Sequence, residues 1–279
     1  MSLSIFTNAS SMASTNALNK SNGALATAME RLGTGKRINS AADDAAGLQI
    51  ATRLQAQSNG MGVAQRNISD ATAMLQTAEG AFDEVTNILH RMKDLSTQAS
   101  NGTNTDKDLT SMQSEFGELS KELTNIMENT SYSGDKLFGT DKLGSAVTFQ
   151  IGASSSETME LDLSATLTAL NTELKTTVGG GDISASADAN TMITTINTAL
   201  DNVSGVRSTL GANINRLGHT SNNLSNMKDN TDVAIGNIMD ADFAAEASNM
   251  TRNQMLSQTS MSMLKQSNSM SGMVMSLLG

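Results

Sequence analysis

A seven-residue repeat of apolar side chains runs through residues 50–92 and constrains the fold more than any other feature of the sequence. One position of the repeat carries large side chains and its companion mostly small ones, with Gln57 as the polar interruption. The large positions are Leu54, Met61, Ile68, Leu75, Phe82 and Leu89, and the companion positions are Ile50, Ala64, Ala71, Ala78, Val85 and Met92. This spacing predicts a long α-helix with at least one other helix lying along it. At about 1.5 Å per residue the helix would span roughly 60 to 80 Å, so we expect an elongated protein.

A second apolar stripe lies beside the first, at Met74, Ala81, Ile88 and Leu95. A single partner helix would leave this stripe exposed to water. The simpler interpretation is that the stripe completes the core of a three-helix bundle. The alternative is that part of it contacts another molecule.

The composition excludes several classes of protein. With no proline, no cysteine, no tryptophan and 3% aromatic residues, the chain suits slender helical bundles and has neither disulfides nor cysteine metal sites. The net charge of -10 and the pI near 4.6 argue against nucleic acid or an anionic membrane as the main partner. No apolar run approaches the roughly 20 residues of a membrane-spanning helix, and the first thirty residues lack the basic flank, apolar block and small-residue cleavage site of an ordinary secretory signal. An extracellular location would therefore require another export route.

The periodicity changes along the chain. Ser40 with Asp43, and Thr105 with Asp108, have the spacing of capping boxes, and we expect each pair to open a helix. Apolar residues at helical spacing over 109–126 predict a second helix folded back on the first. Alternating residues at 147–151 and 159–163 predict a β-hairpin, and helical spacing returns from about residue 190. Towards both ends the apolar stripes become thin and rich in Ala, Ser and Met, so the end helices should need partners.

No constellation of residues predicts catalysis. The run at 33–36, GTGK, lacks the first glycine, the following Ser or Thr and the preceding strand of a phosphate-binding loop. Arg37 is expected in a solvated or intersubunit charge pair. The histidines His90 and His219 lie in separate helices without a second nitrogen ligand nearby, and Asp240, Asp242 and Glu246 flank a helix start where capping is their default role. We therefore expect neither enzymatic activity nor a metal or cofactor.

The two ends and the centre together resemble bacterial flagellin, the subunit of the flagellar filament. The resemblance rests on NALNKSNGALATAMERLGTGKRINSAADDAAGLQIATRL, TAEGAFDEVTNILHRMKDLSTQASNGTN, the hairpin VTFQIGASSSETMELDL, and IMDADFAAEASNMTRNQMLSQTSMSMLKQ near the C-terminus. It covers nearly the whole chain except about 165–189. The chain is short for this family, because its variable outer part shrinks to that segment.

The resemblance implies a mainly α fold: an elongated antiparallel helical bundle with a small β-hairpin region, and a paired N- and C-terminal helix domain. Residues 1–44 and 238–279 form the two halves of the filament-core domain, 45–164 and 190–237 the helical bundle with its hairpin, and 165–189 a short variable surface segment.

The resemblance also implies partners and sites. We expect a homopolymeric, extracellular helical filament whose terminal helices drive assembly, export through the flagellar type III apparatus with an export chaperone, contacts with filament cap and hook-junction proteins, and host flagellin receptors. Arg91 and Leu95 match the family's receptor-binding helix, with Glu115 on the next helix, while Lys93 and Asp94 replace the more usual Arg and Glu. Spacing of four residues should give Arg91 and Leu95 a shared surface. Val274, Leu277 and Leu278 resemble the apolar tail used in assembly and read by intracellular sensors.

Two other functions fit parts of the sequence. A hook-filament junction protein would share the terminal helices but matches the central helices poorly. A cytoplasmic signalling coiled coil would keep strong apolar seams to both ends and would have no β-hairpin. Neither is preferred to a filament subunit.

Overall fold

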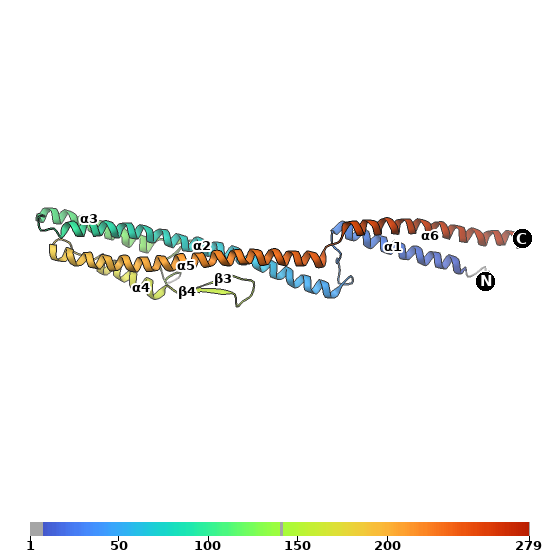
Figure 1. The fold of residues 1–279 in the computed structure, drawn as a ribbon, viewed down its shortest axis with the longest axis horizontal. Coiled ribbons are helices and arrows are strands. Elements are labelled where there is room, and N and C mark those ends of the chain that lie inside the picture. The colour runs from blue at the N-terminus through green and yellow to red at the C-terminus, as the bar shows by residue number, and fades with distance from the viewer. Residues whose placement is uncertain (1–7, 140–141, 279) are drawn as a thin grey trace. The chain divides into compact units, whose positions relative to one another are not determined.

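The computed structural model describes the backbone of residues 8–139 and 142–278, and the side chains of these residues except 271, 272 and 274–278. The chain divides into two units, Gln57–Lys228 and the pair of segments Met1–Ala56 and Asp229–Gly279. Figure 1 labels most of the elements. In chain order they are α1 (Ala9–Thr34), α2 (Ala45–Ala99), α3 (Asp106–Asn129), β1 (Ser131–Tyr132), β2 (Asp135–Lys136), β3 (Val147–Gln150), β4 (Thr158–Leu161), α4 (Ser164–Thr172), the π-helical η1 (Glu173–Val178), α5 (Ser186–Met239) and α6 (Phe243–Leu278). The fold is mainly α, as predicted.

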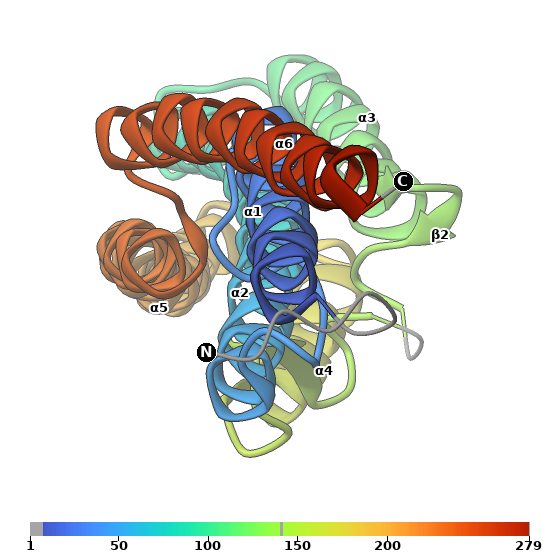
Figure 2. The same cartoon turned by 90° about the vertical axis from the view of Figure 1, so that its right-hand side faces the viewer.

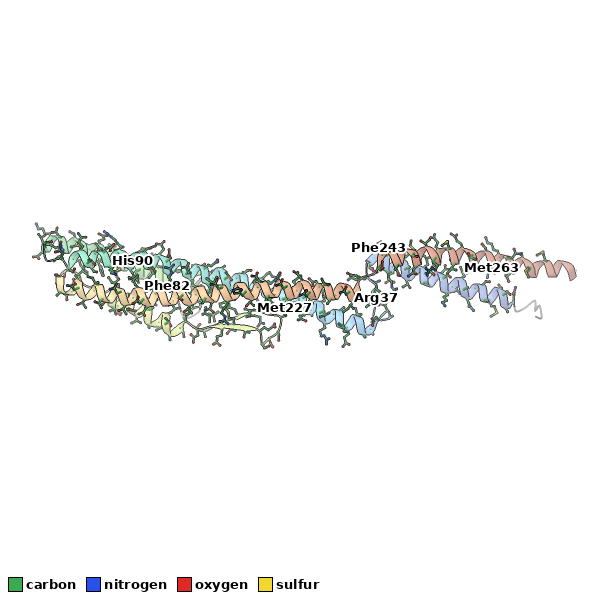
Figure 3. All side chains as sticks on the ribbon, viewed as in Figure 1. Arg37, Phe82, His90, Met227, Phe243 and Met263 are labelled. Atoms are coloured by element: carbon green, nitrogen blue, oxygen red, sulfur yellow. The ribbon has the colours of Figure 1, made fainter. Side chains whose placement is uncertain are left out.

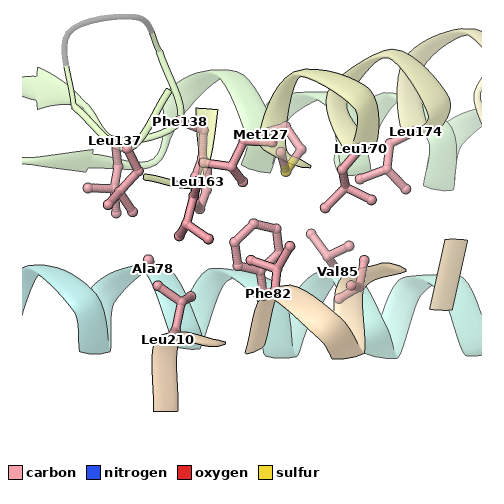
Figure 4. Packing of buried hydrophobic residues seen from close by; sticks show 14 of the residues in the cluster. Ala78, Phe82, Val85, Met127, Leu137, Phe138, Leu163, Leu170, Leu174 and Leu210 are labelled. Atoms are coloured by element: carbon pink, nitrogen blue, oxygen red, sulfur yellow. The ribbon is translucent and has the colours of Figure 1, made fainter. Parts of the chain in front are cut away.

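The central unit is a bundle in which α2, α3, α4, η1 and α5 contribute to one hydrophobic core. The predicted seam of α2 is buried from Met61 to Met92. Phe82 is fully buried, and its ring centroid lies 4.8 Å from that of Phe138. Figure 4 shows Phe82 in one cluster with Val85 of the same helix, Leu210 of α5, and Leu163, Leu170 and Leu174 of the facing segments. The seam is therefore the axis of the bundle, as the heptad repeat indicates.

The second stripe of α2 completes this core. Met74 and Leu95 are buried, and Ala81 and Ile88 pack against the core. The simpler of the two interpretations is therefore correct for this stripe. Earlier in α2, where the helix belongs to the terminal unit, Ile50 is exposed and Leu54 only partly buried.

Arg207 is a charged residue among the apolar residues that recur at helical spacing along α5, and it joins α5 to α2. Its guanidinium lies 2.7 Å from the Glu79 carboxylate and 2.9 Å from that of Asp83. Hydrogen bonding to Glu79 and the two negative charges raise the pKa of Arg207, although burial opposes the shift. Arg207 therefore makes a polar contact at the edge of the apolar core and does not leave a gap in it.

The predicted hairpin is present. Strands β3 and β4 pair antiparallel, with Phe149 opposite Met159. A smaller hairpin, β1–β2, was not predicted. Its turn residues Ser133 and Gly134 have φ of 55° and 94°, the left-handed values that a two-residue turn with φ positive at both positions requires.

Residues 165–189, expected as a short variable surface segment, contain most of α4 and all of η1. Four apolar side chains at spacings of three or four are buried there: Leu167, Leu170, Leu174 and Val178. The glycine-rich loop that follows is held to α3, because the Gln113 amide donates to the Gly181 carbonyl at 3.2 Å and accepts from the Ile183 N–H at 2.7 Å. This segment therefore contributes to the core, and its variability among relatives stays a prediction.

Candidate functional site

In the terminal unit, α1 and α6 lie antiparallel along each other (Figures 1 and 2). Mostly polar side chains join them. The Ser257 hydroxyl donates to the Asn22 amide oxygen at 2.8 Å, the Asn8 amide donates to the Ser267 hydroxyl at 3.0 Å, and the Ser11 hydroxyl donates to Asn268 at 3.1 Å. Such contacts fix the register of the two helices, but they bury little apolar surface.

An ion pair joins the other end of the helix pair. Arg31 in the last turn of α1 lies 3.6 Å from Glu246 in the first turn of α6, with the Glu246 side chain mostly covered. Each charge has the sign that its helix terminus favours. The predicted capping role holds for Asp242, whose carboxylate accepts from the N–H groups of Ala244 and Ala245.

The segment after α1 has a structural role. Gly35, with φ of 71°, ends α1, and its carbonyl accepts from the Ala241 N–H at 3.0 Å. Arg37 donates from its backbone to Met239 and from its guanidinium to the Ile238 carbonyl at 2.8 Å. Within the chain, the Arg37 side chain thus bonds backbone, and the solvated or intersubunit charge pair expected for it stays a prediction.

The start of α2 also differs from the prediction. Asp43 accepts from the N–H groups of Asn39 and Ser40, which forms a turn before the helix. Asp44 instead provides the capping contact, because its carboxylate accepts from the Gly47 N–H at 2.8 Å. The Ser40–Asp43 pair is thus displaced by one turn from the helix start that it was expected to cap.

Very few side chains of the terminal unit are buried. The buried residues of this unit, among those that the structure describes, are Ala28, Ile38, Gly47, Ala51 and Ser257. By contrast, eleven of the thirteen exposed large apolar side chains described in the chain belong to it: Met12, Met29, Ile50, Val233, Phe243, Met255, Leu256, Met261, Met263, Met270 and Met273. Figure 3 labels Phe243 and Met263, which are 62% and 60% exposed. The exposed apolar side chains of the described chain are therefore concentrated in the unit with the smallest buried core.

Three of the exposed residues of α6 recur every seven positions: Leu256, Met263 and Met270. They lie on one face of the helix, as in a coiled-coil seam. Met263 and Met270 also line a shallow groove with Ser10 and Ser14 of α1. The face is therefore continuous with the junction of the two helices. Val274, Leu277 and Leu278 lie outside the residues whose side chains are described, so their predicted role stays a prediction.

The three residues matched to a receptor site occupy different environments. Arg91 on α2 and Glu115 on α3 form an ion pair of 2.6 Å, with side chains 54% and 46% exposed. Leu95 is 2% exposed and belongs to the bundle core. The expectation that Arg91 and Leu95 share a free face is therefore wrong, because the Leu95 side chain is enclosed in the core of the bundle.

The described residues contain no group of three or more His, Cys, Asp and Glu side chains placed to hold a metal ion. None of the helices, within the described part of the chain, is both long and apolar enough to cross a membrane.

Comparison with known proteins agrees with this architecture. Residues 5–142 match the bacterial flagellin N-terminal helical region, and residues 193–278 match the bacterial flagellin C-terminal helical region. The chain belongs to the bacterial flagellin family. It is a structural subunit of the extracellular flagellar filament and not an enzyme.

Individual flagellins extend this similarity. The chain is 42% identical to a flagellin of Halalkalibacterium halodurans over 252 residues, which covers 90% of each protein. It is 37% identical to a flagellin of Listeria monocytogenes over 286 aligned positions, which covers 99% of each. A solved flagellar hook-associated protein of Vibrio parahaemolyticus has a TM-score of 0.56, is 18% identical and matches over 71% of this chain and 100% of that one. This last likeness shows a shared fold alone, so flagellin and not a junction protein is the supported family.

Proposed function

We propose that the paired helices α1 and α6 form the surface through which this flagellin joins further copies of itself in the filament. The observation that carries the proposal is the contrast between the two units. Nearly all the buried apolar side chains that the structure describes belong to the central unit, whereas eleven of the thirteen exposed large apolar side chains belong to the terminal unit. A second copy is the partner that filament formation itself supplies.

The energetics support coupling between ordering and assembly. Ordering a residue costs on the order of 1 to 2 kcal/mol, whereas a large apolar side chain contributes about 1.5 to 3 kcal/mol only when it is fully buried. In the terminal unit, Ile38 is the one large apolar side chain described as buried. Contacts between copies would bury the exposed methionines and leucines, so we propose that the helix pair becomes stable as the filament forms. The same proposal divides the chain into the two halves of the filament-core domain, 1–44 and 238–279, the helical bundle, 45–164 and 190–237, and a variable surface segment, 165–189.

Substitution of the heptad face of α6 tests the proposal. The triple variant Leu256→Gln, Met263→Gln, Met270→Gln should keep the melting of the central unit but lose polymerisation, because glutamine remains helix-compatible and is polar. The matched control is Val63→Gln, an exposed apolar residue of the central unit. If the triple variant forms filaments as efficiently as Val63→Gln, α6 does not provide the assembly surface.

We further propose the partners that the family resemblance implies. These are an export chaperone, the type III export apparatus, filament cap and hook-junction proteins, and host receptors that contact Arg91 and Glu115. Thin packing of the terminal helices is compatible with export of an unfolded chain. For the C-terminal Val274, Leu277 and Leu278, we propose a role in assembly and recognition by intracellular sensors. Their replacement by alanine should lower the polymerisation yield.

A further inference from the structure

Among the methionines whose side chains the structure describes, fifteen fall into two groups that differ in exposure. Seven are buried, and all belong to the central unit: Met61, Met74, Met92, Met112, Met127, Met159 and Met192. Eight are exposed, and all but Met227 lie on α1 or α6: Met12, Met29, Met255, Met261, Met263, Met270 and Met273. We call these last seven residues the methionine surface. It occupies the helix pair whose packing within the chain is weakest.

Its exposure should make the methionine surface the part of the chain that reacts first with two-electron oxidants. The sequence has no cysteine and no tryptophan, so methionine thioethers are its readily oxidised groups. Exposure decides which thioethers react first, because the oxidant has to reach the sulfur. The seven residues of the surface should therefore react before the seven buried in the bundle.

We propose that the methionine surface is a reversible oxidation site for hydroperoxides and that its oxidation stops polymerisation. In the reaction, a lone pair of the thioether sulfur attacks one peroxide oxygen and forms the S–O bond as the O–O bond breaks. The departing oxygen keeps the bonding electrons and takes the proton from the transferred oxygen, which gives water when the oxidant is hydrogen peroxide. Sulfur is oxidised by two electrons, and the peroxide is reduced by two.

The effect on assembly follows from the change in polarity. A sulfoxide is polar and accepts hydrogen bonds, whereas a thioether is apolar. Burial of sulfoxides between copies would leave some of these oxygens without donors, which is unfavourable. This step rests on the proposed assembly surface. Side chains already covered in a filament should be protected, so oxidation should act on subunits before they assemble.

The test uses the full-length subunit, hydrogen peroxide and peptide mass spectrometry. Peroxide should oxidise the methionine surface before the buried methionines, and the treated subunit should need a more than about tenfold higher concentration to polymerise. Treatment with methionine sulfoxide reductases of both stereospecificities should restore polymerisation. Preassembled filaments should show slower oxidation of the same seven residues.

Two variants provide controls. In the first, all seven surface methionines are replaced by leucine, and its polymerisation after peroxide is compared with its own value before treatment. This ratio should stay near one, because leucine is not oxidised. In the second, Met227→Leu removes the exposed methionine outside the surface, and sensitivity to peroxide should remain.

The inference fails if wild-type subunits whose surface methionines are oxidised polymerise at the untreated concentration, or if the buried methionines react as fast. It also fails if reductases remove the sulfoxides without restoring polymerisation. The unoxidised triple variant Leu256→Gln, Met263→Gln, Met270→Gln separates the two proposals. If it polymerises normally, the assembly surface is wrong. If it does not polymerise but the oxidised wild type does, only the oxidation site is wrong.

Discussion

Arg91 and Leu95 are separated by one turn of α2 but have different surroundings. The Arg91 guanidinium is half-exposed and pairs with Glu115 across to α3, whereas the Leu95 side chain is enclosed in the bundle core. Exposed ion pairs contribute little to stability, while loss of a buried leucine removes packing on all sides. Substitutions at these two positions should therefore act through different properties of the protein.

We expect Leu95→Ala to lower the free energy of unfolding by about 2 to 5 kcal/mol, because it leaves a cavity in the core. Arg91→Ala should change it by less than about 0.5 kcal/mol, as is usual for an exposed site. Denaturant unfolding of the two variants measures both values. Equal stability of Leu95→Ala and wild type would contradict the burial of this side chain.

The proposed receptor contact can be tested separately from folding. Arg91→Ala and Glu115→Ala should each weaken signalling through the flagellin-specific Toll-like receptor while leaving thermal unfolding unchanged. The control is Lys121→Ala, which removes an exposed charge from α3 away from this pair. Signalling by both variants at the level of Lys121→Ala would remove Arg91 and Glu115 from the receptor site.

Ionisation of the Asp108 carboxylate should make the stability of the start of α3 depend on pH. Hydrogen bonds from the Thr105 hydroxyl and the Thr105 N–H hold the pKa of Asp108 below its ordinary value of 3.8. A carboxyl group whose pKa is lower in the folded chain than in the unfolded chain stabilises the fold at pH values above its unfolded pKa. This stabilisation is lost as the pH falls through the folded pKa. Asp108→Asn should therefore unfold more easily than wild type at neutral pH. The difference should close below pH 3.8, and a difference that persists there would rule out the ionised carboxylate as its cause.

Among the secondary-structure elements, the loop after η1 depends on one side chain of α3. Both polar atoms of the Gln113 amide bond the loop backbone, at Gly181 and Ile183. Gln113→Ala would leave these partly covered groups unpaired, which costs about 1 to 3 kcal/mol. We expect lower stability and faster amide exchange in the loop. Gln76→Ala, at an exposed position of α2, is the matched control and should have little effect.

The helices whose apolar stripes are long and regular could be predicted from the sequence. The seam through Phe82 and Leu89 repeats without ambiguity, and the alternation around Phe149 is specific to a strand. The apolar stripe of α4 and η1 is short and is followed by three glycines. The composition of this region therefore indicated a surface loop, and the helical segment was not predicted. The start of α2 was predicted one turn too early, because Asp43 and Asp44 are adjacent and both accept backbone N–H groups.

The candidate assembly surface could be predicted only in part. Thin stripes near both ends indicated helices that need partners, but periodicity does not distinguish a side chain that faces α1 from one that faces solvent. The polar register contacts, such as Ser257 with Asn22, join residues far apart in the sequence and carry no local signal. The surface expected to be shared by Arg91 and Leu95 was wrong for the same reason, because burial of Leu95 depends on elements elsewhere in the chain.

The molecule as a whole combines a unit with an extensive core and a unit with almost none. The central unit should fold in the isolated subunit, since its large side chains are buried within the chain. The terminal unit leaves Phe243 and the methionine surface exposed to water, and in the proposed assembly other copies cover them. Ordering of the terminal helices and polymerisation should consequently occur together.

Hydrogen exchange of the same protein as monomer and as filament measures this coupling directly. Amides of α1 and α6 should exchange rapidly in the monomer and become strongly protected in the filament. Amides of α3 and of α5 around Val203 and Leu210 should be protected in both states, because their core does not change. If α1 and α6 are as protected in the monomer as the central bundle is, the terminal helices are stable on their own and the coupling does not exist.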